Sequence, residues 1–295
     1  SLLKKWYWFV ISILISITIA IFYIMCTPPI YTRSASLLIK EDNKSNSPSG
    51  NAGVLYDLDL FQTGTNVNNE IQSLQSPAVM YDVVKRLHLN INYYTKGVFY
   101  NHILYGQNCP YEVEFFDLQD NDVASFTIFP VSGNKGVELT DFIHGGEESE
   151  KRIVVEFNDI STPVGRLLIK PTHGIKDFKE TVYISHSGLQ ATTSVYSGKL
   201  TVALKDEKST VINLSIEDVC IQRAEDVLNT LIAVYNENWV KDKNQIAVST
   251  SMFINERLEV IEQELGHVDE NISSYKSENL LPDVQAAANM YMTQS

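Results

Sequence analysis

The sequence predicts an α+β protein with an N-terminal transmembrane helix, a membrane-proximal α/β base that contains a β-rich insertion, and a long C-terminal coiled-coil-like helix. Residues 6–26 form an uncharged apolar run, residues 111–185 contain short β-rich runs, and the residues after 215 repeat apolar side chains at helical spacing. The predicted boundaries are a cytoplasmic stub at 1–5, the transmembrane helix at 6–26, the base at 27–90, the insertion at 91–199, a hairpin of the base at 200–214, the long helix at 215–281, and the start of a further helical segment at 282–295.

The first predicted element is the anchor. Its 21 residues would form a helix about 31 Å long, which matches the hydrocarbon core of a bilayer. Basic residues precede the run and aromatic residues lie near both ends, so we expect a cytoplasmic N-terminus. A cleaved signal peptide is the alternative, but the run exceeds the usual apolar region of about 7 to 15 residues and no A-x-A-like site follows. The predicted membrane-interface residues are Lys4, Lys5, Trp6, Tyr7, Trp8, Phe22 and Tyr23.

The base should begin directly after the anchor. Pro28 and Pro29 end the helix, and residues 31–40 alternate apolar side chains as a strand does. Residues 69–75 leave room for a short helix. Ser76 and Pro77 then supply an N-cap and a proline at the first helical position, so a second helix should start there and cover a sheet.

The insertion and the hairpin are predicted from β-rich runs. Residues 200–204 and 211–215 flank a charged turn and should form a hairpin that leads into the long helix. Ser215 and Asp218 form an S-x-x-D cap at the predicted helix start. The runs in the insertion are 111–116, 125–129, 152–157, 167–170 and 182–185.

The long helix carries an apolar seam at alternating intervals of four and three residues, which is a heptad pattern. A continuous helix of roughly 60 residues would be about 90 Å long and would need partners outside its own domain. Several shorter helices, broken near residues 236–244 and at Gly266, are the alternative. We expect packing against another copy of the chain or against a returning helix through Ile254, Leu258, Ile261, Leu265, Val268, Ile272 and Tyr275.

Composition limits the possible functions. With 44% hydrophobic residues in 295, the chain is not disordered as a whole. Its 23 basic and 36 acidic residues give a formal charge of −13 without any Lys/Arg-rich run, so no nucleic-acid partner is expected. Cys26, Cys109 and Cys220 show no C-x-x-C spacing, which argues against a disulfide scaffold and a zinc site. A bridge between Cys109 and Cys220 stays open if the chain is exported.

No catalytic, cofactor-binding or metal-binding residue is predicted. The six histidines lack metal-ligand spacing, and the sequence contains neither a phosphate-binding loop nor a G-x-S-x-G elbow. We therefore expect this part of the protein to be non-catalytic and to hold no cofactor. The missing initiator methionine and a helix-forming run that reaches Ser295 are typical of a fragment, whose other parts could carry the chemistry.

Several short motifs occur in a characteristic order. They are the anchor ending Pro28-Pro29-Ile30-Tyr31, the strand 34–39, the segment from Glu70 to Ser76-Pro77 before Leu87-His88-Leu89, the run 229–235, and Phe253, Leu258, Leu265 and Tyr275. This order resembles the bacterial polysaccharide co-polymerase, or chain-length-determinant (Wzz-type), family. The strand-filled interval 89–215 is most similar to the N-terminal membrane and periplasmic part of the tyrosine-autokinase (Wzc-like) branch.

The resemblance implies a homo-oligomeric ring in the bacterial inner membrane, with the bulk of this chain in the periplasm and with polysaccharide polymerase and export machinery as partners. Its function would be to regulate the length and export of capsular or exopolysaccharide. ATP and Mg²⁺ are expected only in a cytoplasmic kinase domain beyond Ser295. The chain departs from the family where Glu217-Asp218 and Arg223-Ala224 replace an Asp-Pro pair and paired alanines. An anchored extracellular sensor domain is the alternative function; an anchored periplasmic enzyme is a third, for which no residue constellation is found.

Overall fold

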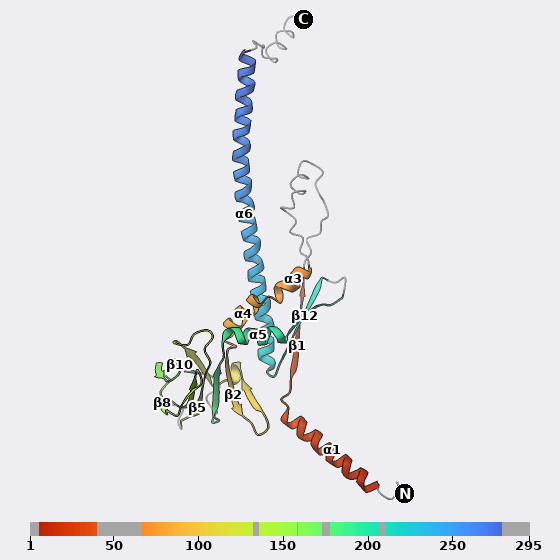
Figure 1. The fold of residues 1–295 in the computed structure, drawn as a ribbon, viewed down its shortest axis with the longest axis vertical. Helices are drawn as coiled ribbons and strands as arrows, with labels where there is room; N and C mark the ends of the chain where they lie inside the picture. The colour runs from red at the N-terminus through yellow and green to blue at the C-terminus, as the bar shows by residue number, and fades with distance from the viewer. Residues whose placement is uncertain are drawn as a thin grey trace. The chain divides into compact units, whose positions relative to one another are not determined.

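The computed structural model describes residues 6–39, 67–131, 136–157, 159–172, 178–206 and 210–278 (Figure 1). Helices and strands are mixed along the chain, which confirms the predicted α+β class. The chain divides into two compact units, residues 1–235 and 236–295. Lys4, Lys5 and the predicted helical segment 282–295 lie outside the described residues.

The first helix, α1 (Trp6–Cys26), coincides with the apolar run and has no buried residue. The Thr18 hydroxyl donates to the Leu14 carbonyl at 2.8 Å. Just after the helix, the Thr27 hydroxyl donates to the Tyr23 carbonyl at 2.9 Å. Both hydroxyl groups thus donate a hydrogen bond to a carbonyl of the same helix. A polar group needs such an internal partner in apolar surroundings, where no water is available.

The base is built on a three-stranded antiparallel sheet in the order β1 (Tyr31–Leu38), β13 (Val211–Asp218), β12 (Leu200–Leu204). Ser215 of β13 lies opposite Ser34 of β1 and Thr201 of β12. The central strand of the base is therefore paired on both sides along most of its length, and one of its partners is the strand that leaves the anchor.

Four helices pack on this sheet and complete the core of the base. Ile212 and Leu214 of β13 are fully buried together with Met80 and Leu231 from the helices. The Tyr235 hydroxyl also donates to a Glu70 carboxylate oxygen. The helices are α3 (Val67–Leu74), α4 (Pro77–Arg86), α5 (Leu189–Lys199) and the first turns of α6 (Ile221–Glu278).

The predicted start of α4 is confirmed. Ser76 has extended backbone geometry, and its side-chain oxygen accepts a hydrogen bond from the Ala78 N–H at 3.3 Å. Pro77 occupies the first helical position, where its missing N–H costs nothing. The buried face of the helix, with Val83 and Val84, belongs to the core of the base.

The insertion is an antiparallel β-sandwich with a core of its own. The larger sheet has the order β3-β2-β11-β5-β6-β7 with β8 paired to β6, and the smaller sheet has the order β4-β10-β9. Inward side chains of both sheets form this core, such as Phe126 and Ile184 from the larger sheet and Leu167 from the smaller sheet. The strands are β2 (Ile91–Lys96), β3 (Asn101–Leu104), β4 (Tyr111–Phe115), β5 (Ala124–Pro130), β6 (Val137–His144), β7 (Glu147–Ser149), β8 (Ile153–Val155), β9 (Asp159–Thr162), β10 (Gly165–Pro171) and β11 (Val182–His186).

The last residues of the predicted insertion, 189–199, form helix α5 and not a part of the sandwich. Leu189 and Tyr196 on α5 belong to the core of the base. The helix was not predicted, because the β-branched Thr192 and Thr193 have low helix propensity. Their hydroxyls donate to the carbonyls of Gly188 and Leu189 at 3.0 and 2.7 Å, so the buried oxygens are satisfied.

Helix α6 is continuous from Ile221 to Glu278, so the alternative of several shorter helices is wrong. The predicted start at Ser215 is also wrong. Ser215 and Asp218 belong to β13, where Asp218 lies opposite Tyr31 of β1. Strand pairing with a distant segment therefore overrides the local cap signal, and the helix begins at Ile221.

Candidate functional site

The predicted membrane-interface residues that the structure describes lie at the two ends of α1. Trp6, Tyr7 and Trp8 occupy its first turn, Phe22 and Tyr23 lie near its end, and all five are exposed. The most apolar window of the helix has a mean hydropathy of 2.7. By length and composition, α1 can therefore span a membrane.

The predicted seam lies on the part of α6 in the second unit. Its exposed fractions run from 39% at Ile261 to 63% at Tyr275. Earlier on the same helix, Ala224, Leu228 and Leu231 are buried in the core of the base. The first part of the apolar stripe is thus buried in the base, and the second part is exposed at Ile254, Leu258, Ile261, Leu265, Val268, Ile272 and Tyr275.

A buried ion pair joins β13 to the start of α6. Asp218 is 2% exposed and Arg223 is 7% exposed. Arg223 Nε and Nη2 donate to the Asp218 carboxylate at 2.8–3.2 Å. Asp218 Oδ1 also accepts from the Cys220 N–H at 2.8 Å, which satisfies a free donor near the helix start. Arg223 Nη1 donates to Asn92 Oδ1 of β2 at 3.3 Å, so the pair also ties the sandwich to the base.

The surroundings of Arg223 hold its guanidinium group in the charged form. Burial alone would lower the pKa of Arg223, but the hydrogen bond to Asp218 and the nearby negative charge raise the pKa above its usual value. Burial raises the pKa of Tyr196 to about 12. Arg223 therefore stays cationic and Tyr196 neutral at ordinary pH, which suits a structural joint. The sequence shows that Asp218 and Arg223 are close along the chain, but no local pattern indicated that Asn92 would lie beside Arg223.

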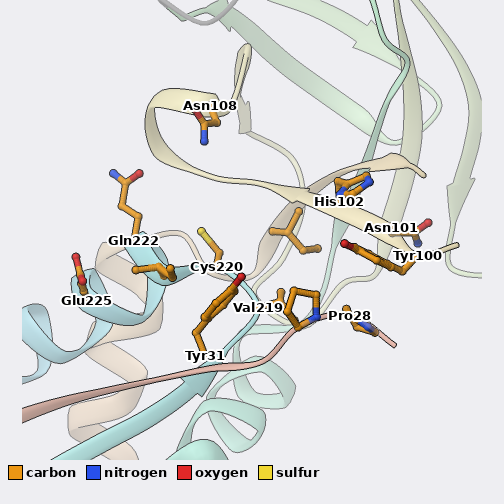
Figure 2. Close-up of a pocket in the computed structure, with 13 residues that line it drawn as sticks. Pro28, Tyr31, Tyr100, Asn101, His102, Asn108, Val219, Cys220, Gln222 and Glu225 are labelled. Carbon is orange, nitrogen blue, oxygen red and sulfur yellow. The ribbon is translucent and has the colours of Figure 1, made fainter. Parts of the chain in front are cut away.

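A cavity of about 440 Å³, which we call the anchor-exit cavity, lies beside the point where the chain leaves α1 (Figure 2). Three segments supply most of its lining: residues 28–31 after the anchor, residues 100–103 of the β2–β3 hairpin, and residues 219–225 at the start of α6. Figure 2 shows Tyr31, Tyr100 and Gln222 arriving from these separate segments. No sequence pattern predicted the cavity, because its walls meet only in the folded base.

Two glycines let the walls of the anchor-exit cavity come close. A Cβ on Gly97 would lie 2.7 Å from His102 Nε2, and the His102 ring packs at 4.9 Å from the Tyr100 ring. Gly106 has a φ of +59°, and a Cβ there would lie 2.6 Å from Gln222 Nε2. Aromatic, amide and imidazole groups therefore face a shared space, where hydrogen bonding and stacking are available.

A buried histidine, His186, and a buried cysteine, Cys109, have hydrogen-bond partners within the fold. His186 Nδ1 donates to the Asp122 carbonyl at 2.8 Å, which leaves Nε2 to accept from the Asn90 amide at 2.9 Å. Cys109 and Cys220 are free thiols, and burial raises the pKa of Cys109 to about 11. Among the described residues, which exclude His173, no group of three or more His, Cys, Asp or Glu could hold a metal ion.

Known proteins resemble this chain in two ways. Residues 1–87 match the family model described as chain length determinant protein (Wzz). The tyrosine-protein kinase ptk of Acinetobacter johnsonii is 22% identical over 311 residues, and the alignment covers 100% of this chain and 42% of that protein. The chain therefore spans less than half the length of this relative. Both findings confirm the predicted resemblance to the chain-length-determinant family and its tyrosine-kinase branch.

Proposed function

We propose that this chain, which carries a chain length determinant domain in residues 1–87, belongs to a membrane-anchored co-polymerase subunit that regulates the length and export of capsular or exopolysaccharide. The family match is the observation that carries the proposal. It covers α1, β1, α3 and α4, which are the apolar helix and the first half of the base. The function therefore belongs to the anchored base and is not a property of the sandwich alone.

The parent protein is, in this proposal, a tyrosine autokinase. The relative that aligns along the whole chain is named a tyrosine-protein kinase, and more than half of its length lies outside the alignment. ATP and Mg²⁺ would bind in that further part, and residues 1–295 would hold neither of them.

The proposed location is the bacterial inner membrane, with the N-terminus cytoplasmic and the base periplasmic. Support comes from the length and apolarity of α1 and from the aromatic residues at both its ends. The two lysines that precede α1 favour this orientation through the positive-inside rule.

The open seam on α6 supports assembly. Seven exposed apolar residues on one helical stripe would be costly in water, so we propose that a neighbouring subunit of a homo-oligomeric ring or a returning helix covers them. Anchoring in a membrane raises the effective concentration of the subunits and favours such packing. Polysaccharide polymerase and export proteins would be the further partners.

The experiment is complementation of a deletion strain with the full-length protein, followed by gel analysis of the polysaccharide length distribution. Leu258→Asp places a charge on the seam. Val260→Asp, on the same helix but outside the seam, is the matched control, because Val260 is also exposed. We expect wild type and Val260→Asp to restore the normal length distribution and Leu258→Asp to shorten or broaden it.

Chemical crosslinking in membranes accompanies this test. Leu258→Asp should reduce crosslinked oligomers relative to Val260→Asp, unless a returning helix within the same subunit covers the seam. A deletion strain with an unchanged polysaccharide length distribution would refute the proposed function. An altered transcriptional response in that strain would instead favour the sensor alternative.

A further inference from the structure

The turn between β2 and β3 presents two adjacent apolar side chains to solvent. Val98 is 93% exposed and Phe99 is 44% exposed. The Gly97 N–H donates to the Tyr100 carbonyl at 3.2 Å, and a Cβ on residue 97 would lie 2.4 Å from the same oxygen. The turn thus has a tight backbone that only glycine permits. Since single exposed apolar residues are common, the position and charge of this turn decide its role.

The turn lies beside the end of the anchor. Tyr100 lines the same cavity as Pro28 and Pro29, which follow closely after Cys26, the last residue of α1 (Figure 2). Val98 is two residues from Tyr100 and therefore within about 7 Å of it along the chain. When α1 fills the hydrocarbon core, the two prolines stand in the headgroup layer, which is about 5–7 Å thick on each side. The apolar turn is within reach of that layer.

The segment that contains the turn is free of acidic residues. The chain has 36 acidic residues and a net charge of −13, yet no Asp or Glu occurs between Asp82 and Glu112. Lys96 directly precedes the turn, and its ammonium group lies 4.2 Å from the centre of the Tyr183 ring. The carboxylate in the lining of the cavity, Glu225, is paired with an arginine. An anionic lipid surface would repel most of the chain but tolerate this segment.

We propose that the β2–β3 turn docks into the headgroup layer of an anionic bilayer beside the anchor, with Val98 and Phe99 inserted and Lys96 near the lipid phosphates. The inference rests on the proposed function, because it requires α1 to span the membrane. Apolar and aromatic side chains flanked by a basic residue are the composition that membrane interfaces favour. This second contact would orient the sandwich against the bilayer, which one helix followed by a short segment cannot do.

The test measures the depth of the turn in a membrane. Full-length protein is reconstituted in vesicles of phosphatidylcholine and phosphatidylglycerol, with Cys26, Cys220 and any accessible cysteine beyond residue 295 replaced by serine. A polarity-sensitive dye is attached to one introduced cysteine per sample, and quenching is measured with iodide in the water and with spin-labelled lipids. The labelled variants are Val98→Cys in the turn, Ile24→Cys in the anchor, and Val195→Cys as an exposed control on α5.

The dye at Val98→Cys should be quenched by lipids that carry the spin label near the headgroup, and its iodide quenching constant should be several-fold smaller than at Val195→Cys. A Lys96→Glu change in the Val98→Cys background should restore part of the iodide quenching in the anionic vesicles. Circular dichroism of each variant checks that the fold is retained, so that a change reports on docking.

Three results would overturn the inference. If the anchor dye at Ile24→Cys is quenched by lipid while Val98→Cys behaves like Val195→Cys, the turn does not dock although the chain is anchored. If Val98→Cys is shielded from iodide without quenching by lipid, a protein surface covers the turn. If the dye at Ile24→Cys is itself not quenched by lipid, the proposed anchoring fails and the docking fails with it.

Discussion

Replacement of Asp218 by asparagine should destabilise the first unit more than any comparable change of a surface carboxylate. The asparagine side chain would keep an oxygen that can accept from the Cys220 N–H, so the hydrogen bond near the start of α6 can persist. The substitution removes only the negative charge that Arg223 faces at 2.8 Å. Arg223 would remain buried at 7% exposure, with Asn92 as its other hydrogen-bond partner and with Lys199 nearby.

The expected cost follows from this burial. Removal of one partner of a buried ion pair typically lowers the free energy of unfolding by about 3–5 kcal/mol, because the remaining charge is left uncompensated. For a unit of this size, each kcal/mol lowers the unfolding midpoint by about 2–4 °C, so the midpoint should fall by about 6–20 °C. A double variant, Asp218→Asn with Arg223→Met, removes both charges and should recover most of the loss.

Thermal unfolding of the detergent-solubilised protein, followed by near-ultraviolet circular dichroism, measures these midpoints. Asp117→Asn is the matched control, because Asp117 also pairs with an arginine, Arg166, at 3.3 Å, but both side chains are about half exposed. Exposed pairs contribute little, so this control should leave the midpoint nearly unchanged. Equal falls of the unfolding midpoint in Asp218→Asn and Asp117→Asn would refute the stabilising role of the buried ion pair. A double variant whose midpoint is no higher than that of Asp218→Asn would refute it as well.

Two further outcomes test the base and the sandwich. Burial raises the pKa of Cys109 from 9.0 to about 11, so the folded protein holds the thiol proton more tightly than the unfolded chain does. The resulting stability is present below about pH 9 and is lost toward about pH 11. Across this range, wild type should therefore lose about 2–3 kcal/mol of unfolding free energy relative to Cys109→Ala. Urea unfolding measures this difference, and unfolding free energies of the two proteins that change with pH in parallel would contradict the burial of Cys109. Leu231→Ala, in the core of the base at 0% exposure, should cost about 2–5 kcal/mol, whereas Val260→Ala, at 38% exposure on the same helix and outside the seam, should change the unfolding free energy of the detergent-solubilised protein by about 0.5 kcal/mol or less. Equal losses of the two variants in calorimetry would contradict the burial of Leu231 in the core of the base.

Local sequence signals were sufficient where an element depends on its own residues. The apolar run that became α1, the Ser76-Pro77 start of α4 and the heptad pattern of α6 each reflect composition, capping or periodicity within one segment. The predicted runs 125–129 and 182–185 in the sandwich also match β5 and β11, and β11 alternates buried and half-buried side chains along its own length.

Local signals failed where distant residues decide the structure. Helix α5 contains Thr192 and Thr193 and has little intrinsic preference for helix, yet its packing into the base places it there. Ser215 and Asp218 match a helix cap locally, but pairing with β1, about 180 residues earlier, makes both of them part of strand β13. No β-rich run was recognised in the sequences of β6 and β9. These strands form by pairing with their neighbours in the sheets, β5 and β10.

The sequence by itself determined the fold class, the membrane-length helix and the start of α4, and it favoured a long helix over several shorter ones, because these features depend on composition and periodicity within single segments. Only the tertiary structure decided where α6 begins, which part of its apolar stripe the base covers, how Asp218 and Arg223 reach Asn92, and which segments enclose the anchor-exit cavity. These features depend on contacts between residues far apart in the chain, and the free energy of such contacts exceeds the small preferences that a local pattern records.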